Sequence, residues 1–126
     1  AASIVFSNIP SYGAGLNVWK MAQLGETTPK EQFTVQQMDD GILEMLLMKT
    51  VNTVAFLKSK TFYAEALRHA QAANYVIRFK PDVTHIYCQI DGEGYKITHP
   101  RDIIISRAGQ RTVIKGDDNT HYDQVL

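Results

Sequence analysis

The amino-acid sequence predicts a mainly β fold with one helical insertion (α+β), built on an antiparallel sheet or sandwich. Five or six short segments are rich in β-branched and aromatic residues or alternate between apolar and polar residues, as strands do. Short turns join most of these segments, which favours antiparallel pairing over alternating βαβ units. One alanine-rich segment has helical spacing instead. With 126 residues, the chain has the length of a single domain.

The amino-terminal part predicts two strands separated by a long connection. Residues 3–9 form the first predicted strand, and the turn residues of 10–15 end it. Residues 21–37 are polar and show no apolar period, so we expect a long, mobile loop. After the turn signal of 39–41, residues 42–48 are apolar on both faces and predict a buried central strand.

A helix is predicted in the middle of the chain. Asn52 is a suitable N-cap, and alanines and aromatic residues recur at spacings of three and four over residues 52–72. Residues 59–61 are a weak point that can split this segment into two helices.

The carboxy-terminal part again predicts strands, at residues 75–80, 86–90, 95–98 and 102–106. Between two of them, Asp91-Gly92 is the strongest two-residue hairpin signal in the chain. We therefore expect one domain over residues 1–109 and an extended or frayed tail over residues 110–126.

Composition and charge exclude several classes of protein. Thirteen basic residues balance thirteen acidic ones, which argues against a nucleic-acid binder that works by counterion release. A hydrophobic fraction of 44% argues against intrinsic disorder. Cys88 is the single cysteine, so an internal disulfide and a multi-cysteine zinc site are excluded, and we expect a soluble domain of a reducing compartment. Because a predicted strand follows Ala1 almost directly, we also expect the chain to be part of something larger.

Two acidic turns and one glycine-bearing loop can carry chemistry. Asp91-Gly92-Glu93 places two carboxylates on a tight hairpin, where Glu93 can act as a general base, although such a motif is more often only a turn. Asp39-Asp40 offers oxygen ligands for Mg²⁺, with a solvated turn as the alternative. Residues 8–15 join a strand end to a glycine-bearing loop whose backbone N–H groups can face an anion, without the Lys-Ser or Lys-Thr of a P-loop.

Other residues give weaker signals. The four histidines form no close pair and are expected at the surface or in the core. Trp19 either packs in the core or touches a ligand, and Cys88 is expected to be an inert core thiol. Taken alone, the residues indicate a soluble β-rich domain with acidic turns.

Three segments together resemble the diacylglycerol kinase family. Residues 8–19 (NIPSYGAGLNVW) resemble its N-x-P-S-x-x-G-G-x-N-x-W block, and residues 39–44 (DDGILE) resemble its D-G-x-L-E strand opening. Residues 89–93 (QIDGE) match its Q-[IV]-D-G-E hairpin. The resemblance covers about residues 3–107 and points to the accessory, carboxy-terminal part of the catalytic region.

This resemblance implies a lipid kinase that transfers the γ-phosphoryl group of ATP to diacylglycerol and gives phosphatidic acid; related enzymes use sphingoid bases or ceramide. In the family, a separate amino-terminal α/β domain carries a G-G-D-G-T nucleotide-binding segment, and this chain contains no such segment. We therefore expect the chain to be inactive alone, with ATP and Mg²⁺ bound mainly by that other domain. A β-sandwich-like accessory domain is expected to help form the interdomain cleft and the lipid site.

The same resemblance assigns roles to the acidic turns. Glu93 is the candidate catalytic base near the transferred phosphate, and Asp91 shapes the turn or orients Glu93. Asp39 or Asp40 corresponds to the acidic position of a structural Mg²⁺.

The glycine-bearing loop supplies the candidate cofactor-binding residues. Asn8 and Ser11 are expected at the domain junction, where Gly13 and Gly15 allow close approach of the backbone. Ala14 replaces a family glycine, which weighs against a phosphate-cradling loop.

The partners implied are diacylglycerol or a related lipid, the nucleotide-binding domain and a transient membrane surface, but no nucleic acid. A cytoplasmic protein, peripheral at membranes, is expected, and an exposed apolar face permits a homodimer in isolation. Two alternatives remain open: a non-catalytic lipid- or protein-binding module derived from such a kinase, and an unrelated β-sandwich.

Overall fold

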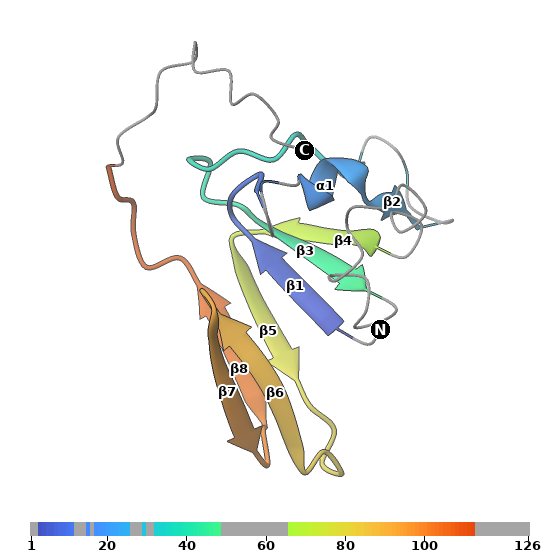
Figure 1. Ribbon diagram of the computed structural model, residues 1–126, viewed down its shortest axis with the longest axis vertical. Helices are drawn as coiled ribbons and strands as arrows, with labels where there is room; N and C mark the ends of the chain where they lie inside the picture. The colour runs from blue at the N-terminus through green and yellow to red at the C-terminus, as the bar shows by residue number, and fades with distance from the viewer. Residues whose placement is uncertain are drawn as a thin grey trace.

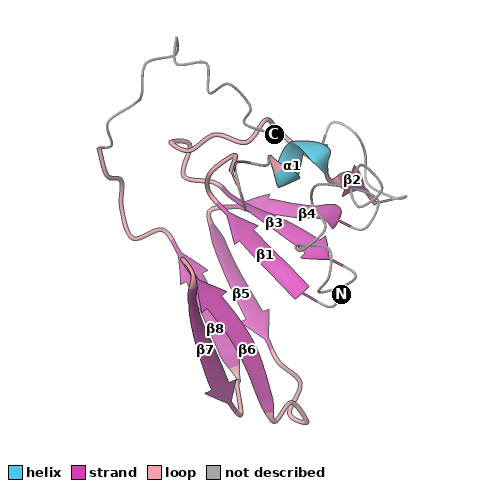
Figure 2. Ribbon diagram, viewed as in Figure 1, coloured by secondary structure: helices cyan, strands magenta, loops and turns pink. Residues whose placement is uncertain are grey.

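The computed structural model describes residues 3–11, 15, 17–25, 29, 32–48 and 66–112. Of these residues 50% are in strands and 6% are helical, which confirms the mainly β class (Figure 2). The strands form one four-stranded sheet and two two-stranded ladders, and all pairs but one are antiparallel. The stacking of a sandwich stays a prediction. No helix among the described residues is long and apolar enough to cross a membrane.

The four-stranded sheet has the order β1-β3-β4-β2 (Figure 1). Its strands are β1 (Ser3–Ser7), β3 (Leu43–Met48), β4 (Ala66–Ala72) and the short β2 (Gln23–Leu24). As predicted, β3 is central, because both of its edges are hydrogen-bonded to antiparallel neighbours. β2 runs parallel to β4.

The core lies on one face of this sheet, beneath the short helix α1 (Val18–Met21). The side chain of Asn17 caps α1 by accepting a hydrogen bond from the Lys20 N–H at 2.8 Å. Trp19 is 4% exposed, and its ring meets Phe33 edge-on at 5.2 Å, so Trp19 packs in the core. The buried apolar residues are Val18, Trp19, Ala22, Leu46, Met48 and Ala66.

The predicted helix is wrong where the structure tests it, because Ala66–Ala72 is strand β4; residues 52–65 lie outside the described part. The pairing shifts register between Met45 and Leu46, so that His69 has no partner on β3. Because of this bulge, the side chains of β4 do not alternate regularly between the two faces of the sheet, and the sequence pattern that identifies a strand is lost. Pairing along β3 then outweighs the helical propensity of the alanines.

The predicted loop of 21–37 also contains more structure than expected. Met21 ends α1 and Gln23–Leu24 is β2, whereas residues 33 to 37 belong to no helix or strand. That stretch is nonetheless fixed to the sheet, since the Gln71 Oε1 accepts a hydrogen bond from the Thr34 N–H at 2.9 Å.

The remaining strands form the lower half of Figure 1. β5 (Asn74–Arg78) pairs with β8 (Asp102–Ser106), and β6 (His85–Ile90) pairs with β7 (Glu93–Thr98). These bounds confirm the strands predicted there within a few residues.

Tyr75 at the start of β5 links this half to the four-stranded sheet. Its hydroxyl donates to the Leu43 carbonyl at 2.6 Å, and its ring meets Phe6 edge-on at 5.0 Å. Burial raises the pKa of Tyr75, and the charge of Glu44 raises it further. None of the core apolar residues lies on β5–β8, so the main core belongs to the four-stranded sheet.

Candidate functional site

The Asp91-Gly92 turn joins β6 to β7 as the sequence predicts. Ile90 pairs directly with Glu93, which leaves a two-residue loop. Asp91 has φ 48° and Gly92 has φ 94°, so both turn residues are left-handed, as a type I′ hairpin requires. Asp91 therefore shapes the turn, and Glu93 is the first residue of a strand with a fixed direction.

Glu93 is exposed and is held by its neighbour on the same face of β7. The Tyr95 hydroxyl donates to Glu93 Oε2 at 2.9 Å, and this hydrogen bond raises the pKa of Tyr95. A side chain added at Gly92 or Gly94 would meet no atom within 4 Å, so there is open space around the turn. Sequence analysis missed Tyr95, although a spacing of two on a strand puts it beside Glu93.

The aspartate turn is shaped by its own side chains. Asp40 Oδ1 accepts a hydrogen bond from the Ile42 N–H at 2.8 Å, and Gly41 takes φ 74°. In the described ranges, no three His, Cys, Asp or Glu side chains gather as a metal site would need. Because Mg²⁺ prefers about six oxygen ligands, Asp39 and Asp40 by themselves do not complete a magnesium site.

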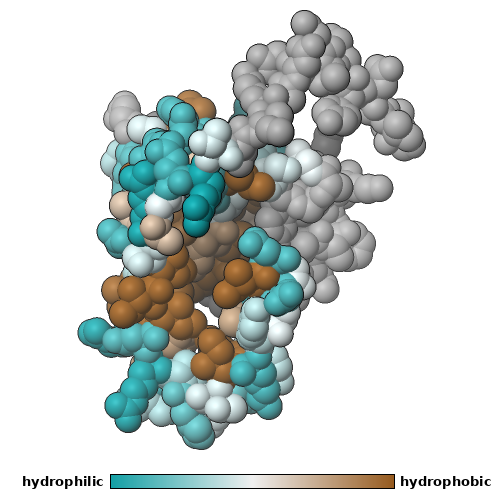
Figure 3. All heavy atoms as spheres, turned by 90° about the vertical axis from the view of Figure 1, so that its left-hand side faces the viewer, coloured by the Kyte–Doolittle hydropathy of each residue, from teal (hydrophilic) through white to brown (hydrophobic). Residues whose placement is uncertain are grey.

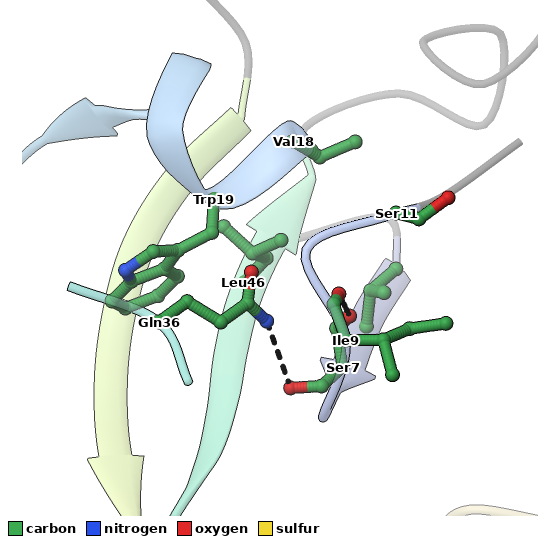
Figure 4. Close-up of a pocket in the computed structure, with 8 residues that line it drawn as sticks. Ser7, Ile9, Ser11, Val18, Trp19, Gln36 and Leu46 are labelled. Atoms are coloured by element: carbon green, nitrogen blue, oxygen red, sulfur yellow. Dashed lines mark hydrogen bonds between the residues drawn. The ribbon is translucent and has the colours of Figure 1, made fainter. Parts of the chain in front are cut away.

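Of the candidate cofactor-binding residues, only Ser11 lines a cavity, and that cavity is very small (Figure 4). Its volume is about 10 Å³, which is room for a single water and far too little for a nucleotide. Ser11 is exposed at its rim, and in Figure 4 its side chain points away from Trp19 and Leu46. Gly15 is exposed with φ 84°, whereas Gly13 lies outside the described residues. The cavity beside Ser11 therefore does not fit ATP.

Two contacts bring separate parts of the candidate site together. Asn8 Nδ2 donates to the Met38 carbonyl at 3.4 Å, which ties the amino-terminal loop to the aspartate turn. The Arg107 guanidinium, just beyond β8, lies over Gly41, with Nη1 3.2 Å from where a Cβ would be. Within the residues that the structure describes, no hydrogen bond joins Glu93 to this turn.

Sequence analysis also missed a buried carboxylate, Glu44, on the core face of β3. Glu44 is 0% exposed, and its two oxygens accept hydrogen bonds from Gln36 Nε2 at 2.8 Å and Gln71 Nε2 at 3.0 Å. Gln36 also donates to the Ser7 carbonyl at 3.3 Å, the dashed line in Figure 4. The signal in the sequence was a lone carboxylate within an apolar strand. Through its hydrogen bond to Gln36, Glu44 attaches the segment around Gln36 to the sheet.

Comparison with known proteins identifies the family. The family model described as "Diacylglycerol kinase accessory domain" matches residues 1–94. The chain belongs to this family. The matched range of the accessory domain contains every candidate site residue named from the sequence, whereas Tyr95 and Arg107 lie beyond it.

Two curated relatives carry the same family name. The accessory domain is 32% identical over 120 residues to diacylglycerol kinase 4 of Arabidopsis thaliana, and 27% identical to diacylglycerol kinase 1 of Oryza sativa subsp. japonica. Each match covers 91% of this chain but only 24% of the relative, so the accessory domain spans about a quarter of their length. No solved structure matches the chain.

Proposed function

We propose that this chain is the accessory part of a lipid kinase that transfers the γ-phosphoryl group of ATP to the free hydroxyl of diacylglycerol, giving phosphatidic acid. The observation that carries the proposal is Glu93, an exposed carboxylate on a type I′ hairpin, inside the region that matches the family. Membership of the family supports the reaction class, and the names of both relatives support diacylglycerol as substrate.

In this proposal Glu93 is the general base. The lipid hydroxyl oxygen forms the new bond to phosphorus, the bond from phosphorus to the ADP oxygen breaks, and the hydroxyl proton passes to Glu93. Glu93 Oε2 accepts the hydrogen bond from Tyr95, and Oε1 has no hydrogen-bond partner in the described part of the chain. We therefore assign Oε1 as the oxygen that accepts the proton. Tyr95 thus acts as a positioning residue, and Asp91 maintains the turn.

We further propose that a nucleotide-binding domain supplies most of the ATP and Mg²⁺ contacts, because neither the small cavity at Ser11 nor Asp39 and Asp40 alone fits these groups. Exposed apolar residues support a covering partner domain: Val76 and Ile104 pair across β5 and β8 and are 59% and 71% exposed. Figure 3 shows apolar surface gathered across the middle of one face of the molecule. The lipid substrate implies a cytoplasmic enzyme that works transiently at a membrane surface.

A chimaera tests the proposal. This chain replaces the matching quarter of Arabidopsis diacylglycerol kinase 4, and the assay measures phosphatidic acid formed from diacylglycerol and ATP. We expect the chimaera to be active, and Glu93→Gln to lower kcat by about 10²–10⁴-fold, the usual contribution of a general base. Tyr95→Phe is expected to lower kcat by about tenfold, because one hydrogen bond to a charged group is lost.

Asp82→Asn is the matched control, since it removes another exposed carboxylate, in the turn between β5 and β6. It should leave kcat unchanged. A folded but inactive chimaera would contradict the kinase assignment, whereas an active chimaera that tolerates Glu93→Gln would contradict only the role of Glu93.

A further inference from the structure

An open cleft lies at the end of β5–β8 that is opposite the Asp91-Gly92 turn. There β5 and β7 end and β6 and β8 begin, as the lower end of Figure 1 shows. The cleft measures about 510 Å³, within the range of about 300–1,000 Å³ that is usual for small-molecule sites. Its lining residues are Arg78, Phe79, Pro81, Val83, His99, Pro100, Arg101 and Asp102.

Backbone hydrogen bonds hold the walls of the cleft in place. The Phe79 N–H donates to the Arg101 carbonyl at 2.8 Å, and the His99 N–H donates to the Thr84 carbonyl at 2.7 Å. Pro100 between them is buried, which anchors this connection although the surrounding turns are exposed. The cleft is therefore formed before any ligand arrives, which lowers the entropic cost of binding.

His99 adopts a strained backbone conformation, with φ 47°. A left-handed conformation is unfavourable for a side chain with a Cβ, and such strain gathers at ligand-binding sites. Because the Thr84 hydrogen bond fixes this conformation, the imidazole is kept at the wall of the cleft.

The charges of the cleft favour an anion. Arg78 and Asp102 form a two-pronged ion pair at 3.2 and 3.3 Å, so these two charges compensate each other. The guanidinium of Arg101 and the imidazole of His99 have no hydrogen-bond partner in the ranges that the structure covers. A guanidinium donates well to phosphate oxygens, in pairs of parallel hydrogen bonds.

The remaining walls are apolar, formed by Phe79, Pro81, Val83 and Pro100. We propose that this cleft binds a phosphate-bearing ligand with an apolar part, with Arg101 and His99 on the phosphate and the apolar walls on the rest. Both the head group of an anionic phospholipid and a soluble organic phosphate have this chemistry.

This site is separate from the proposed catalytic carboxylate. Glu93 begins β7 and Thr98 ends it, so the six residues between cleft and turn span roughly 20 Å at about 3.3 Å per residue. The proposal therefore does not depend on phosphoryl transfer, and its test measures binding by the chain alone.

The test compares two ligands on the 126-residue chain. One is a vesicle of phosphatidylcholine with phosphatidic acid, measured by co-sedimentation against phosphatidylcholine alone. The other is glycerol 3-phosphate, measured by calorimetry. We expect Arg101→Gln to weaken binding about tenfold or more, as the loss of a charge-assisted hydrogen bond implies.

Two further variants make the result specific. Lys20→Gln removes the positive charge of an exposed side chain on α1, outside the cleft, and should leave binding unchanged. His99→Asn removes the imidazole with a residue that tolerates a left-handed backbone, so it carries the test if Arg101→Gln does not fold.

Binding to the acidic vesicles, lost with Arg101→Gln or His99→Asn, supports the site and identifies a membrane lipid as its ligand. Binding of glycerol 3-phosphate with the same losses supports the site and identifies a soluble phosphate. The proposal is overturned if neither ligand binds, or if Lys20→Gln weakens binding as much as the cleft variants do, since only net charge would then matter.

Discussion

Replacing Glu44 with glutamine tests the buried network that joins β3 to its neighbours. The carboxylate accepts one hydrogen bond from Gln36 and one from Gln71 on its two separate oxygens. A glutamine at position 44 has one oxygen and one NH₂ group there, so one of the two amide donors would face another donor.

The expected loss follows from this geometry. Leaving one buried donor without an acceptor costs about 1–3 kcal/mol, so we expect Glu44→Gln to lower the free energy of unfolding by about 2 kcal/mol. Glu44→Leu removes one acceptor from each amide, although Gln36 still donates to the Ser7 carbonyl and Gln71 to the Thr34 carbonyl, so the loss should be about 2–6 kcal/mol. Domains are stable by only about 5–15 kcal/mol, so each loss is a large fraction of the total.

Urea unfolding measured by tryptophan fluorescence provides the assay. Trp19 is the single tryptophan and is 4% exposed in the core, so its emission reports loss of this packing. With a slope of about 2 kcal/mol per molar urea, Glu44→Gln should lower the midpoint by about 1 M.

The exposed Glu93→Gln is the matched control, with a change within about 0.5 kcal/mol. If Glu44→Gln changes stability no more than this control does, or if Glu44→Leu is the more stable of the two variants, the network does not hold the sheet together as argued.

Two further predictions concern the aspartate turn and the tyrosine that links the two halves. Gly41→Ala should lower the free energy of unfolding by about 1–2 kcal/mol because of the φ of 74° at Gly41, and Gly41→Asn should lower it by less. If truncating Arg107 restores the stability of Gly41→Ala in urea unfolding, the contact with Arg107 and not backbone strain causes the loss. The raised pKa of Tyr75 means that its hydroxyl keeps its proton to a higher pH in the folded state than in the unfolded state. The stability that this protonated hydroxyl contributes is therefore complete below pH 10 and is lost as the pH rises above 10. Tyr75→Phe should flatten the fall of the melting temperature above pH 10, and an unchanged fall would contradict the assignment.

Local chemistry explains which predictions the structure confirms. The Asp91-Gly92 turn was predictable because a type I′ hairpin needs two left-handed residues, and Asp-Gly is among the pairs that adopt them most easily. β3 was predictable because a continuous apolar run is typical of a strand inside a sheet, and both edges of β3 are paired. The class of the fold follows from such local signals.

The missed elements depend on distant partners. The bulge opposite Met45 and Leu46 changes the phase of β4, and no local pattern encodes where that extra residue falls. Helix α1 is only four residues long, so packing of Trp19 determines it more than propensity does. The position of Arg107 over Gly41 joins residues far apart in the chain, and no spacing in the sequence indicates it.

The sequence by itself therefore determined the β class and the hairpin, because each depends on backbone preferences within a few neighbouring residues, whereas the catalytic role of Glu93 stays a prediction. Only the tertiary structure decided that residues 66–72 are a strand, that Tyr95 holds Glu93, that Glu44 is buried and that Arg101 and His99 line a cleft. The strand at 66–72, the burial of Glu44 and the cleft each depend on contacts between residues from different parts of the chain. Tyr95 is the exception, since its spacing placed it beside Glu93 but the hydrogen bond required the side-chain positions to be known.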